Sequence, residues 1–164
     1  MMIASTPTSQ DLASRLDWTT PADTVKGMLF NGLLGALERQ LGPDARERCR
    51  KASGEDELID FFGYPVASFL KLLYAAAEQL APKVGGREEA LRGLGRQAVN
   101  DIMASRVGQT VLLLADGSPR RMLFTLPSAY RTAVSYGDRN AELASETHGF
   151  FVMKRFSDRT KNLV

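Results

Sequence analysis

The chain has 164 residues, of which 44% are hydrophobic and 24% are charged, a composition typical of globular rather than disordered proteins. Its 21 Lys and Arg residues exceed its 19 Asp and Glu residues by only two, so the net charge indicates no nucleic-acid-binding surface. One Cys and one His exclude an internal disulfide and a closed four-ligand zinc site built from these residue types. We therefore expect no metal and no cofactor.

The first strong helix signal lies at Thr20-Pro21-Ala22-Asp23. A threonine N-cap, a proline at the first helical position and a carboxylate near the positive end of the helix dipole together predict a helix start. This helix is expected to end at Gly42-Pro43. Before it, Ser9 is expected to cap a short amphipathic turn that carries Leu12 and Leu16.

Three more helices are predicted from apolar residues that recur at helical spacing between Pro and Gly stop signals. They begin at Pro43, Pro65 and Arg87, and the first two end at Gly54 and at Pro82 with Gly85-Gly86. A largely apolar and aromatic run, LIDFFGY, precedes Pro65. Further along, short helices are predicted on both sides of the turn DGSP at residues 116–119.

From Ala129 onward the pattern changes to that of β-strands. Three strands are predicted in YRTAVSY, AELASET and FFVMKRF, separated by turns at residues 137–140 and at His148-Gly149. In the first of these strands, Tyr130 and Tyr136 should face inward, with Arg131 and Arg139 as their polar partners.

Helices followed by an antiparallel sheet predict an α+β fold, in which an N-terminal helical layer packs on a C-terminal antiparallel sheet of about three strands. We expect a partly ordered N-terminal segment over residues 1–19, a single domain over residues 20–156 and a tail over residues 157–164. The longest apolar runs, residues 72–77 and 111–115, are too short to cross a bilayer, and no signal peptide is recognisable. The sequence therefore predicts a cytoplasmic protein without a membrane partner.

Two residues have side chains that could act chemically. His148 is the only histidine, and it lies in a Thr-His-Gly turn without a recognisable nucleophile beside it. Cys49 lies between Arg48 and Arg50, which could favour the thiolate, although a single cysteine more often packs as a small buried residue. No phosphate-binding loop is present. We expect no catalytic residue and no enzymatic activity.

Three glycines, Gly27, Gly32 and Gly35, lie within the predicted helix that begins at Pro21. Each costs about 1 kcal/mol relative to alanine in a helix interior. We therefore expect this side of the helix to contact another helix or a second copy of the chain closely, as an interface.

The aromatic residues of the first half suggest a second kind of site. Most of them should belong to the hydrophobic core, because aromatic side chains bury large areas. Some of them could instead line an apolar pocket for a lipid or a flat ligand. The candidates are Phe30, Phe61, Tyr64, Phe69 and Tyr74.

Four blocks of sequence carry a resemblance that covers residues 12–155: TVKGMLFNGL, DFFGYPV, LGRQA and PSAYRTAVSYG. They resemble a paralogous family of uncharacterised proteins, a domain of unknown function expanded in myxobacteria. That family is similar, more distantly, to the fold of haem-NO-binding sensors and TRAPP-like vinyl-reductase domains. The resemblance implies a helical layer on an antiparallel sheet. It does not imply haem, because the Tyr-x-Ser-x-Arg motif of the haem sensors is missing after Tyr130.

These features favour a non-enzymatic signalling or adaptor domain that acts through protein–protein interaction, with an apolar ligand pocket as an option. The alternative is a sensor that binds haem or an acyl chain between the helices and the sheet. The family's relatives continue with a helix and two strands after the segment FVMKR, so the strand FFVMKRF should present an open edge. With the glycine-bearing helix, this edge predicts a homodimer besides an unknown protein partner. The alternative is a monomer whose last ten residues fold back over the edge.

Overall fold

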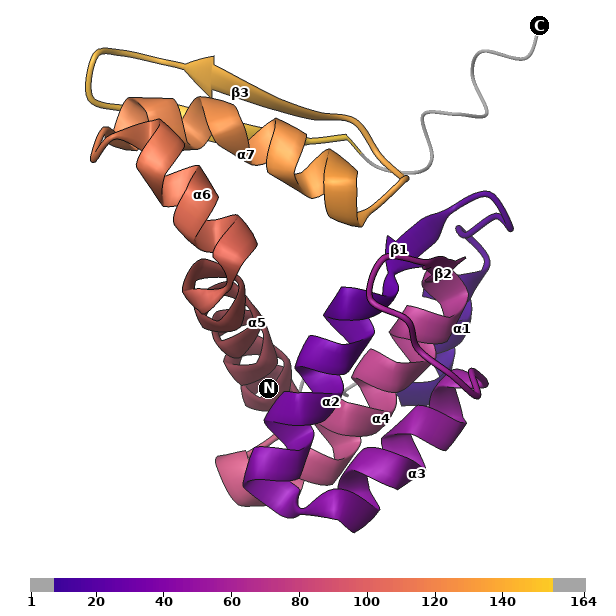
Figure 1. Cartoon of the computed structure of the whole chain (residues 1–164). Coiled ribbons are helices and arrows are strands. Elements are labelled where there is room, and N and C mark those ends of the chain that lie inside the picture. Colours follow the sequence, from indigo (N-terminus) through magenta and orange to yellow (C-terminus); the bar gives the residue numbers. More distant parts are fainter. Residues whose placement is uncertain (1–7, 155–164) are drawn as a thin grey trace, which may run out of the picture. The chain divides into compact units, whose positions relative to one another are not determined.

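The computed structural model describes residues 8–154, which form seven helices and four short strands, as predicted for an α+β fold (Figure 1). The chain divides into two compact units, Met1–Gly95 (unit 1) and Arg96–Val164 (unit 2). Unit 1 contains α1 (Thr8–Leu16), β1 (Thr24–Lys26), α2 (Gly27–Leu41), α3 (Pro43–Ser53), β2 (Gly63–Pro65) and α4 (Val66–Val84). The helix α5 (Arg87–Ala104) crosses the boundary, and unit 2 continues with α6 (Arg106–Ala115), α7 (Pro119–Ala133), β3 (Arg139–Leu143) and β4 (Gly149–Met153).

The predicted ends of three helices at glycines are confirmed, but Pro82 does not end α4, which continues to Val84. Gly42 follows α2, while Gly54 and Gly85 follow α3 and α4 with φ angles of 82° and 91°. Glycine adopts such left-handed angles without the steric penalty of a Cβ atom, so it ends a helix at a defined residue. The helix α1 is also present, as the spacing of Leu12 and Leu16 predicted.

The predicted helix start at Thr20 is wrong. The Asp23 carboxylate accepts hydrogen bonds from the backbone N–H and the hydroxyl of Thr20, at 2.8 and 2.9 Å, and so closes a turn instead of beginning a helix. The next three residues form β1, which pairs antiparallel with β2 so that Val25 lies opposite Tyr64. The helix α2 begins only at Gly27. This long-range pairing overrides the local helix signal.

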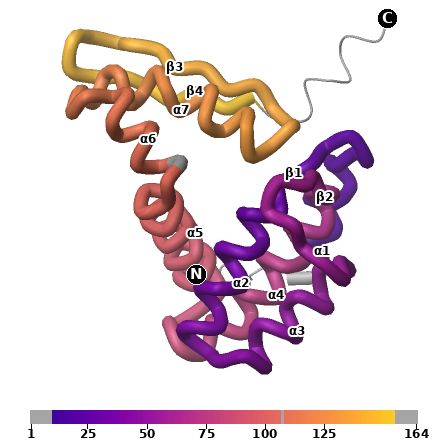
Figure 2. Tube along the Cα trace, in the orientation of Figure 1, coloured from indigo at the N-terminus to yellow at the C-terminus, as the bar shows by residue number. Residues whose placement is uncertain are grey.

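The core of unit 1 lies between α2, α3 and α4, which pack beside one another (Figure 2). Apolar residues spaced three and four positions apart on each helix meet there, as amphipathic helices require. The largest fully buried side chains are Val25, Phe30, Leu34, Leu37, Cys49 and Leu72, together with the polar Asp23 and Ser53. The backbone N–H of Val66 donates to the Asp23 carbonyl at 2.9 Å, which ties the turn before β1 to the start of α4.

In unit 2, the two short helices predicted around the turn at residues 116–119 are confirmed as α6 and α7. The helix α7, however, continues to Ala133 through most of the segment predicted as the first strand. Its side chains pack on β3, β4 and α6, and these contacts outweigh the strand preference of Tyr130 and Thr132. Among the described residues, the C-terminal sheet therefore has two strands instead of about three.

The hairpin of β3 and β4 is antiparallel, with Arg139 opposite Met153 and Leu143 opposite Gly149. The predicted turn at His148 is confirmed, but the predicted inward strand of Tyr130 and Tyr136 is wrong. Arg139 is the buried residue instead, with its guanidinium 5.2 and 5.3 Å from the two tyrosine ring centres.

Arg139 lies at the start of β3, where its Nη1 atom donates to the carbonyls of Tyr136 and Gly137 at 2.6 and 3.3 Å. The tail predicted over residues 157–164 and the last two residues of the predicted strand FFVMKRF, 155 and 156, lie outside the described residues, 8–154. The single domain over residues 20–156 stays a prediction.

Candidate functional site

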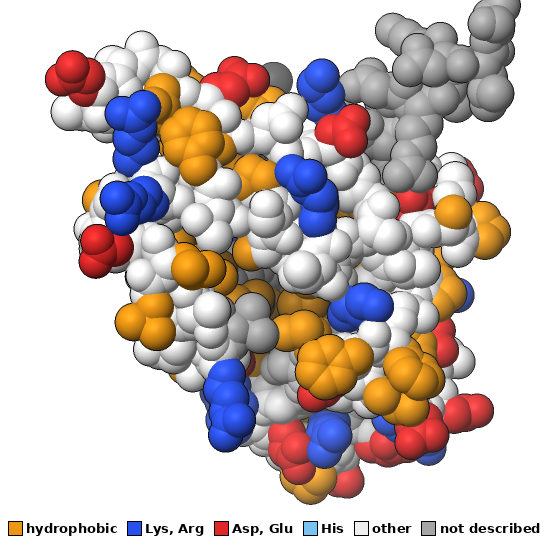
Figure 3. Space-filling model, turned by 45° about the horizontal axis from the view of Figure 1, so that its top comes forward, with side chains coloured by type: hydrophobic (Ala, Val, Ile, Leu, Met, Phe, Trp, Pro, Cys, Tyr) orange, Lys and Arg blue, Asp and Glu red, His pale blue; other side chains and the backbone are white. Residues whose placement is uncertain are grey.

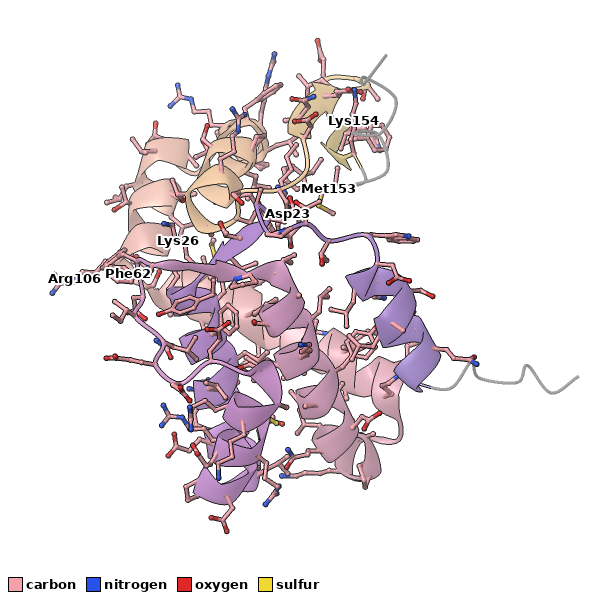
Figure 4. The ribbon with its side chains drawn as sticks, turned by 90° about the vertical axis from the view of Figure 1, so that its right-hand side faces the viewer. Asp23, Lys26, Phe62, Arg106, Met153 and Lys154 are labelled. Carbon is pink, nitrogen blue, oxygen red and sulfur yellow. The ribbon has the colours of Figure 1, made fainter. Side chains whose placement is uncertain are left out.

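The segment between α3 and β2, residues 54–62, exposes three large apolar side chains to solvent. We call it the aromatic loop. Its Ile59, Phe61 and Phe62 side chains are 40%, 77% and 60% exposed. Figure 4 shows Phe62 and Lys26 on the same side of unit 1. Single exposed apolar residues are common on protein surfaces, but three exposed apolar side chains close together in one loop indicate an interaction site.

Backbone hydrogen bonds hold the aromatic loop against the start of α2. The first N–H groups of a helix have no partner within that helix, and Lys26 at the N-cap position makes no side-chain cap. The loop supplies the acceptors: Gly27 N–H donates to the Phe62 carbonyl at 2.9 Å, and Met28 N–H donates to the Asp60 carbonyl at 3.0 Å. The loop therefore caps α2, and its path is fixed by that helix.

Side chains from four elements add further hydrogen bonds to the loop. Lys26 Nζ donates to the Phe61 carbonyl at 2.8 Å, and the Tyr64 hydroxyl accepts from the Ile59 N–H at 2.8 Å. Asn31 Nδ2 donates to the Leu58 carbonyl and to the Asp60 carboxylate, while Arg50 Nη1 donates to the carbonyls of Glu55 and Asp56. The backbone beneath the exposed rings is thus anchored along most of its length.

Gly27 makes a close approach, as predicted, but to the backbone of the aromatic loop instead of to another helix. A Cβ atom built at Gly27 would lie 2.1 Å from the Ile59 carbonyl oxygen and 3.0 Å from the Tyr64 ring. Gly32 has no described atom within 4 Å of such a Cβ atom, and at Gly35 only the Arg39 side chain comes near, at 3.5 Å. An interface of Gly32 and Gly35 with a second copy stays a prediction.

Three of the five predicted pocket residues come together, with the ring of Phe30 packed on those of Tyr64 and Phe69. Phe30 is fully buried, and its ring meets those of Tyr64 and Phe69 edge to face, at 5.6 and 5.1 Å between ring centres. This arrangement is typical of packed aromatic side chains. Phe61 points away from this cluster into solvent. Ile59 and Phe62 are absent from the residues predicted from sequence, although both belong to the apolar run before Pro65.

Tyr74, the fifth predicted pocket residue, contacts α1 instead. Its hydroxyl donates a short hydrogen bond to the Asp11 carboxylate, and the Arg87 guanidinium lies 5.9 Å from its ring centre. An open hollow of about 730 Å³ lies beside this contact, lined by Gln10, Asp11, Ala13, Ser14, Asp17 and Arg87. Most of these side chains are polar, so the hollow does not have the apolar lining that was predicted for a lipid or a flat ligand.

The hydrogen bond from Tyr74 is the main cause that lowers the pKa of Asp11, with the charges of Arg15 and Arg87 adding to it and burial opposing it. A lowered pKa means that this contact stabilises the fold above pH 3.8, the ordinary value, and loses that effect as the pH falls below it. We expect Tyr74→Phe to move the Asp11 pKa back toward 3.8 in an NMR titration of its carboxyl carbon. Amide exchange in α1 should become about fivefold faster, the factor for a hydrogen bond worth about 1 kcal/mol. An unchanged Asp11 titration would contradict this account.

Cys49 is fully buried in α3, where Gln79 Nε2 donates to its sulfur at 2.9 Å. Burial raises the pKa of the Cys49 thiol, and the Arg48 charge and the Gln79 hydrogen bond oppose that effect only in part. The thiolate that two flanking arginines could have favoured is therefore disfavoured. His148 is exposed in the turn of the hairpin, where its Nδ1 atom lies 2.9 Å from the Thr147 hydroxyl.

For Cys49, we expect a thiol reagent at pH 8 to react at least about 100-fold more slowly with the native chain than with the chain in denaturant, because reaction requires local opening. The native state holds the thiol proton more tightly than the unfolded state. The free energy of unfolding should therefore fall as the pH rises above 9.0, and Cys49→Ala should lack that part of the fall. Equal reaction rates in native and denatured chains would show that the thiol is accessible.

Charged side chains of both signs are interspersed on the face shown in Figure 3. No helix within residues 8–154 is long and apolar enough to cross a membrane. Within the same residues, no three His, Cys, Asp or Glu side chains form a group that could hold a metal ion.

Residues 18–159 match a protein family described as "Protein of unknown function (DUF2378)". The chain belongs to this family. The match confirms the predicted resemblance to an uncharacterised family over most of the chain, and it includes the complete aromatic loop and both described strand pairs. Of the DUF2378 chain's described helices, only α1 lies outside the matched residues. No curated protein and no solved structure matches the chain.

Proposed function

We propose that this DUF2378 protein is a non-enzymatic, cytoplasmic signalling or adaptor domain that recognises a protein through its aromatic loop. The observation that carries the proposal is the exposure of Phe61 and Phe62 on a backbone held by hydrogen bonds from β1, α2, α3 and β2. The proposal includes a homodimer and a further protein partner, and neither a nucleic acid nor a membrane.

Energetics support a binding role for these two side chains. A phenylalanine that remains exposed contributes little to folding, whereas its burial in a partner's cleft removes a large apolar area from water. Aromatic side chains are common among the few residues that supply most of the affinity of an interface. A loop that is already fixed also loses little conformational entropy on binding. Rigid backbone and exposed aromatic rings together favour recognition.

The alternative function is a sensor that binds haem or an acyl chain, and it stays a prediction, as does the more distant likeness to haem-NO-binding and TRAPP-like folds. Among the described residues, no observation favours the sensor over the interaction domain. Phe30, Tyr64 and Phe69 were expected to line its pocket, but the ring of Phe30 packs directly against the other two rings.

Site-specific photo-crosslinking tests the proposed function. The photoreactive residue p-benzoylphenylalanine replaces Phe62 in the full chain, which is produced in the cells that naturally contain it. A matched variant carries the same residue at Glu78, an exposed position of α4. We expect a discrete protein crosslinked at position 62, identified by mass spectrometry, that is absent at position 78. Equal crosslinking at both positions, or none at position 62, would overturn the proposal.

A further inference from the structure

Among the described helices of unit 2, α7 has the largest excess of charges of one sign. It contains three arginines and no acidic residue. Arg120, Phe124 and Arg131 are all exposed, and their spacing of four and seven residues places them on one side of the helix. The opposite side packs on the hairpin of β3 and β4, so the exposed side is free of that contact. We call these three residues the α7 face.

The aromatic loop has the opposite chemistry. Between Gly54 and Gly63 its own residues carry four carboxylates and no Lys or Arg, and the cations nearest to it are Lys26 and Arg50, which donate hydrogen bonds to its backbone. Asp56, Glu57 and Asp60 are exposed, and Asp60 accepts a hydrogen bond from Asn31, whereas Glu55 is half-buried and accepts one from Ser68. The exposed acids thus precede the exposed phenylalanines in the loop, while the arginines of the α7 face lie on both sides of Phe124 in the sequence.

We propose that the aromatic loop of one copy of the chain docks on the α7 face of a second copy. This inference rests on the proposed function, and it names the partner of the same site. Every copy brings both a loop and an α7 face, so each copy can supply either half of the contact, and we expect the closed two-fold symmetry of most small oligomers. In each contact, Phe61 and Phe62 pack against Phe124 in the centre, and carboxylates face guanidinium groups at the rim.

Each half of this contact has a physical role. Aromatic burial supplies affinity, because the central rings lose their contact with water. Opposite charges at the rim fix the register and speed association, and juxtaposed like charges suppress it. Arginine suits such a rim, because its guanidinium pairs with carboxylates in a planar geometry. The loop carboxylates and the α7 arginines therefore select each other, as well as attracting each other.

A charge-exchange experiment with full-length chains tests the inference. Loop reversal is Asp56→Lys with Glu57→Lys, and helix reversal is Arg120→Glu with Arg131→Glu. Sedimentation equilibrium at micromolar concentration should give about 36 kDa for the unmodified protein, twice the 18.0 kDa of one chain. Each reversed variant alone should dissociate at least about 100-fold more readily and sediment at 18.0 kDa, because both of its contacts juxtapose like charges.

The decisive sample is an equimolar mixture of the two reversed variants. In a mixed dimer, the basic loop of one chain meets the acidic α7 of the other, and the natural loop meets the natural α7. We expect the mixture to recover a dimer that contains one chain of each kind, which native mass spectrometry resolves. Recovery also shows that both variants are folded.

A control with two exposed acids outside the loop, Glu78→Lys and Glu146→Lys, should leave the dimer intact. A dimer that persists in both reversed variants would place the contact elsewhere and overturn the inference. A monomeric unmodified protein would overturn it too, and the proposed function would then stand or fall on the crosslinking at position 62. Reversed variants that stay monomeric when mixed would equally contradict it.

Discussion

Replacing Phe30 by alanine should lower the free energy of unfolding by about 3–5 kcal/mol, the usual cost of removing a buried phenylalanine. Phe30 is fully buried, and the rings of Tyr64 and Phe69 on either side of it would lose their partner. The loss should appear as a lower denaturant midpoint with an unchanged slope in urea unfolding. Far-ultraviolet circular dichroism at zero denaturant controls for a folded starting state.

Phe61→Ala is the matched variant for that experiment, since it removes the same side chain from an exposed position of the same unit. We expect its free energy of unfolding to stay within about 0.5 kcal/mol of the unmodified value, as for most surface substitutions. If Phe30→Ala lowered the free energy of unfolding as little as Phe61→Ala, Phe30 would line a cavity that can collapse. Such a cavity is what the predicted ligand pocket requires. If Phe61→Ala were as severe as Phe30→Ala, the aromatic loop would be part of the core.

Gly27→Ala should destabilise the chain by about 1–3 kcal/mol, the range for a group forced into a filled space. Its Cβ atom would lie 2.1 Å from the Ile59 carbonyl oxygen, which is a backbone atom and cannot rotate away. The aromatic loop must therefore move, and the hydrogen bonds that it accepts from Gly27 and Met28 must lengthen. Urea unfolding measures the loss, and faster amide exchange at Met28 and Phe62 would show where it arises.

Gly32→Ala provides the control for Gly27→Ala, because it adds the same methyl group to the same helix. No described atom lies within 4 Å of that position, so the change should stabilise α2 by up to about 1 kcal/mol through helix propensity alone. Equal effects at the two positions would show that the approach of the aromatic loop to Gly27 does not exist in solution.

The parts of the fold that depend on local chemistry could be predicted from the sequence. Gly54 and Gly85 end their helices because their φ angles are positive, which does not depend on contacts with distant segments. The predicted helix start at Thr20 and the predicted strand at Tyr130 are wrong, because contacts with distant segments decide the conformation there. Pairing of β1 with β2 extends the chain after Asp23, and packing on the hairpin keeps Tyr130 helical.

The candidate site was only partly predictable for the same reason. The run LIDFFGY signals an aromatic segment, but the sequence does not show which rings point inward. That choice depends on the first N–H groups of α2, which take the carbonyls of Asp60 and Phe62 as caps and so direct the adjacent side chains outward. For α7, a signal was present in the sequence, because residues 119–133 contain three arginines and no acid.

The central claim is that Phe61 and Phe62 bind a protein and do not stabilise the fold. The most direct test places p-benzoylphenylalanine at Glu57, on the exposed rim of the aromatic loop, in the unmodified chain and in a Phe61→Ala, Phe62→Ala chain. We predict that the two chains melt at the same temperature, and that the double variant loses at least about 30-fold in crosslinked protein, as expected when interface residues worth 2 kcal/mol or more are removed. Undiminished crosslinking in a folded double variant would contradict the claim.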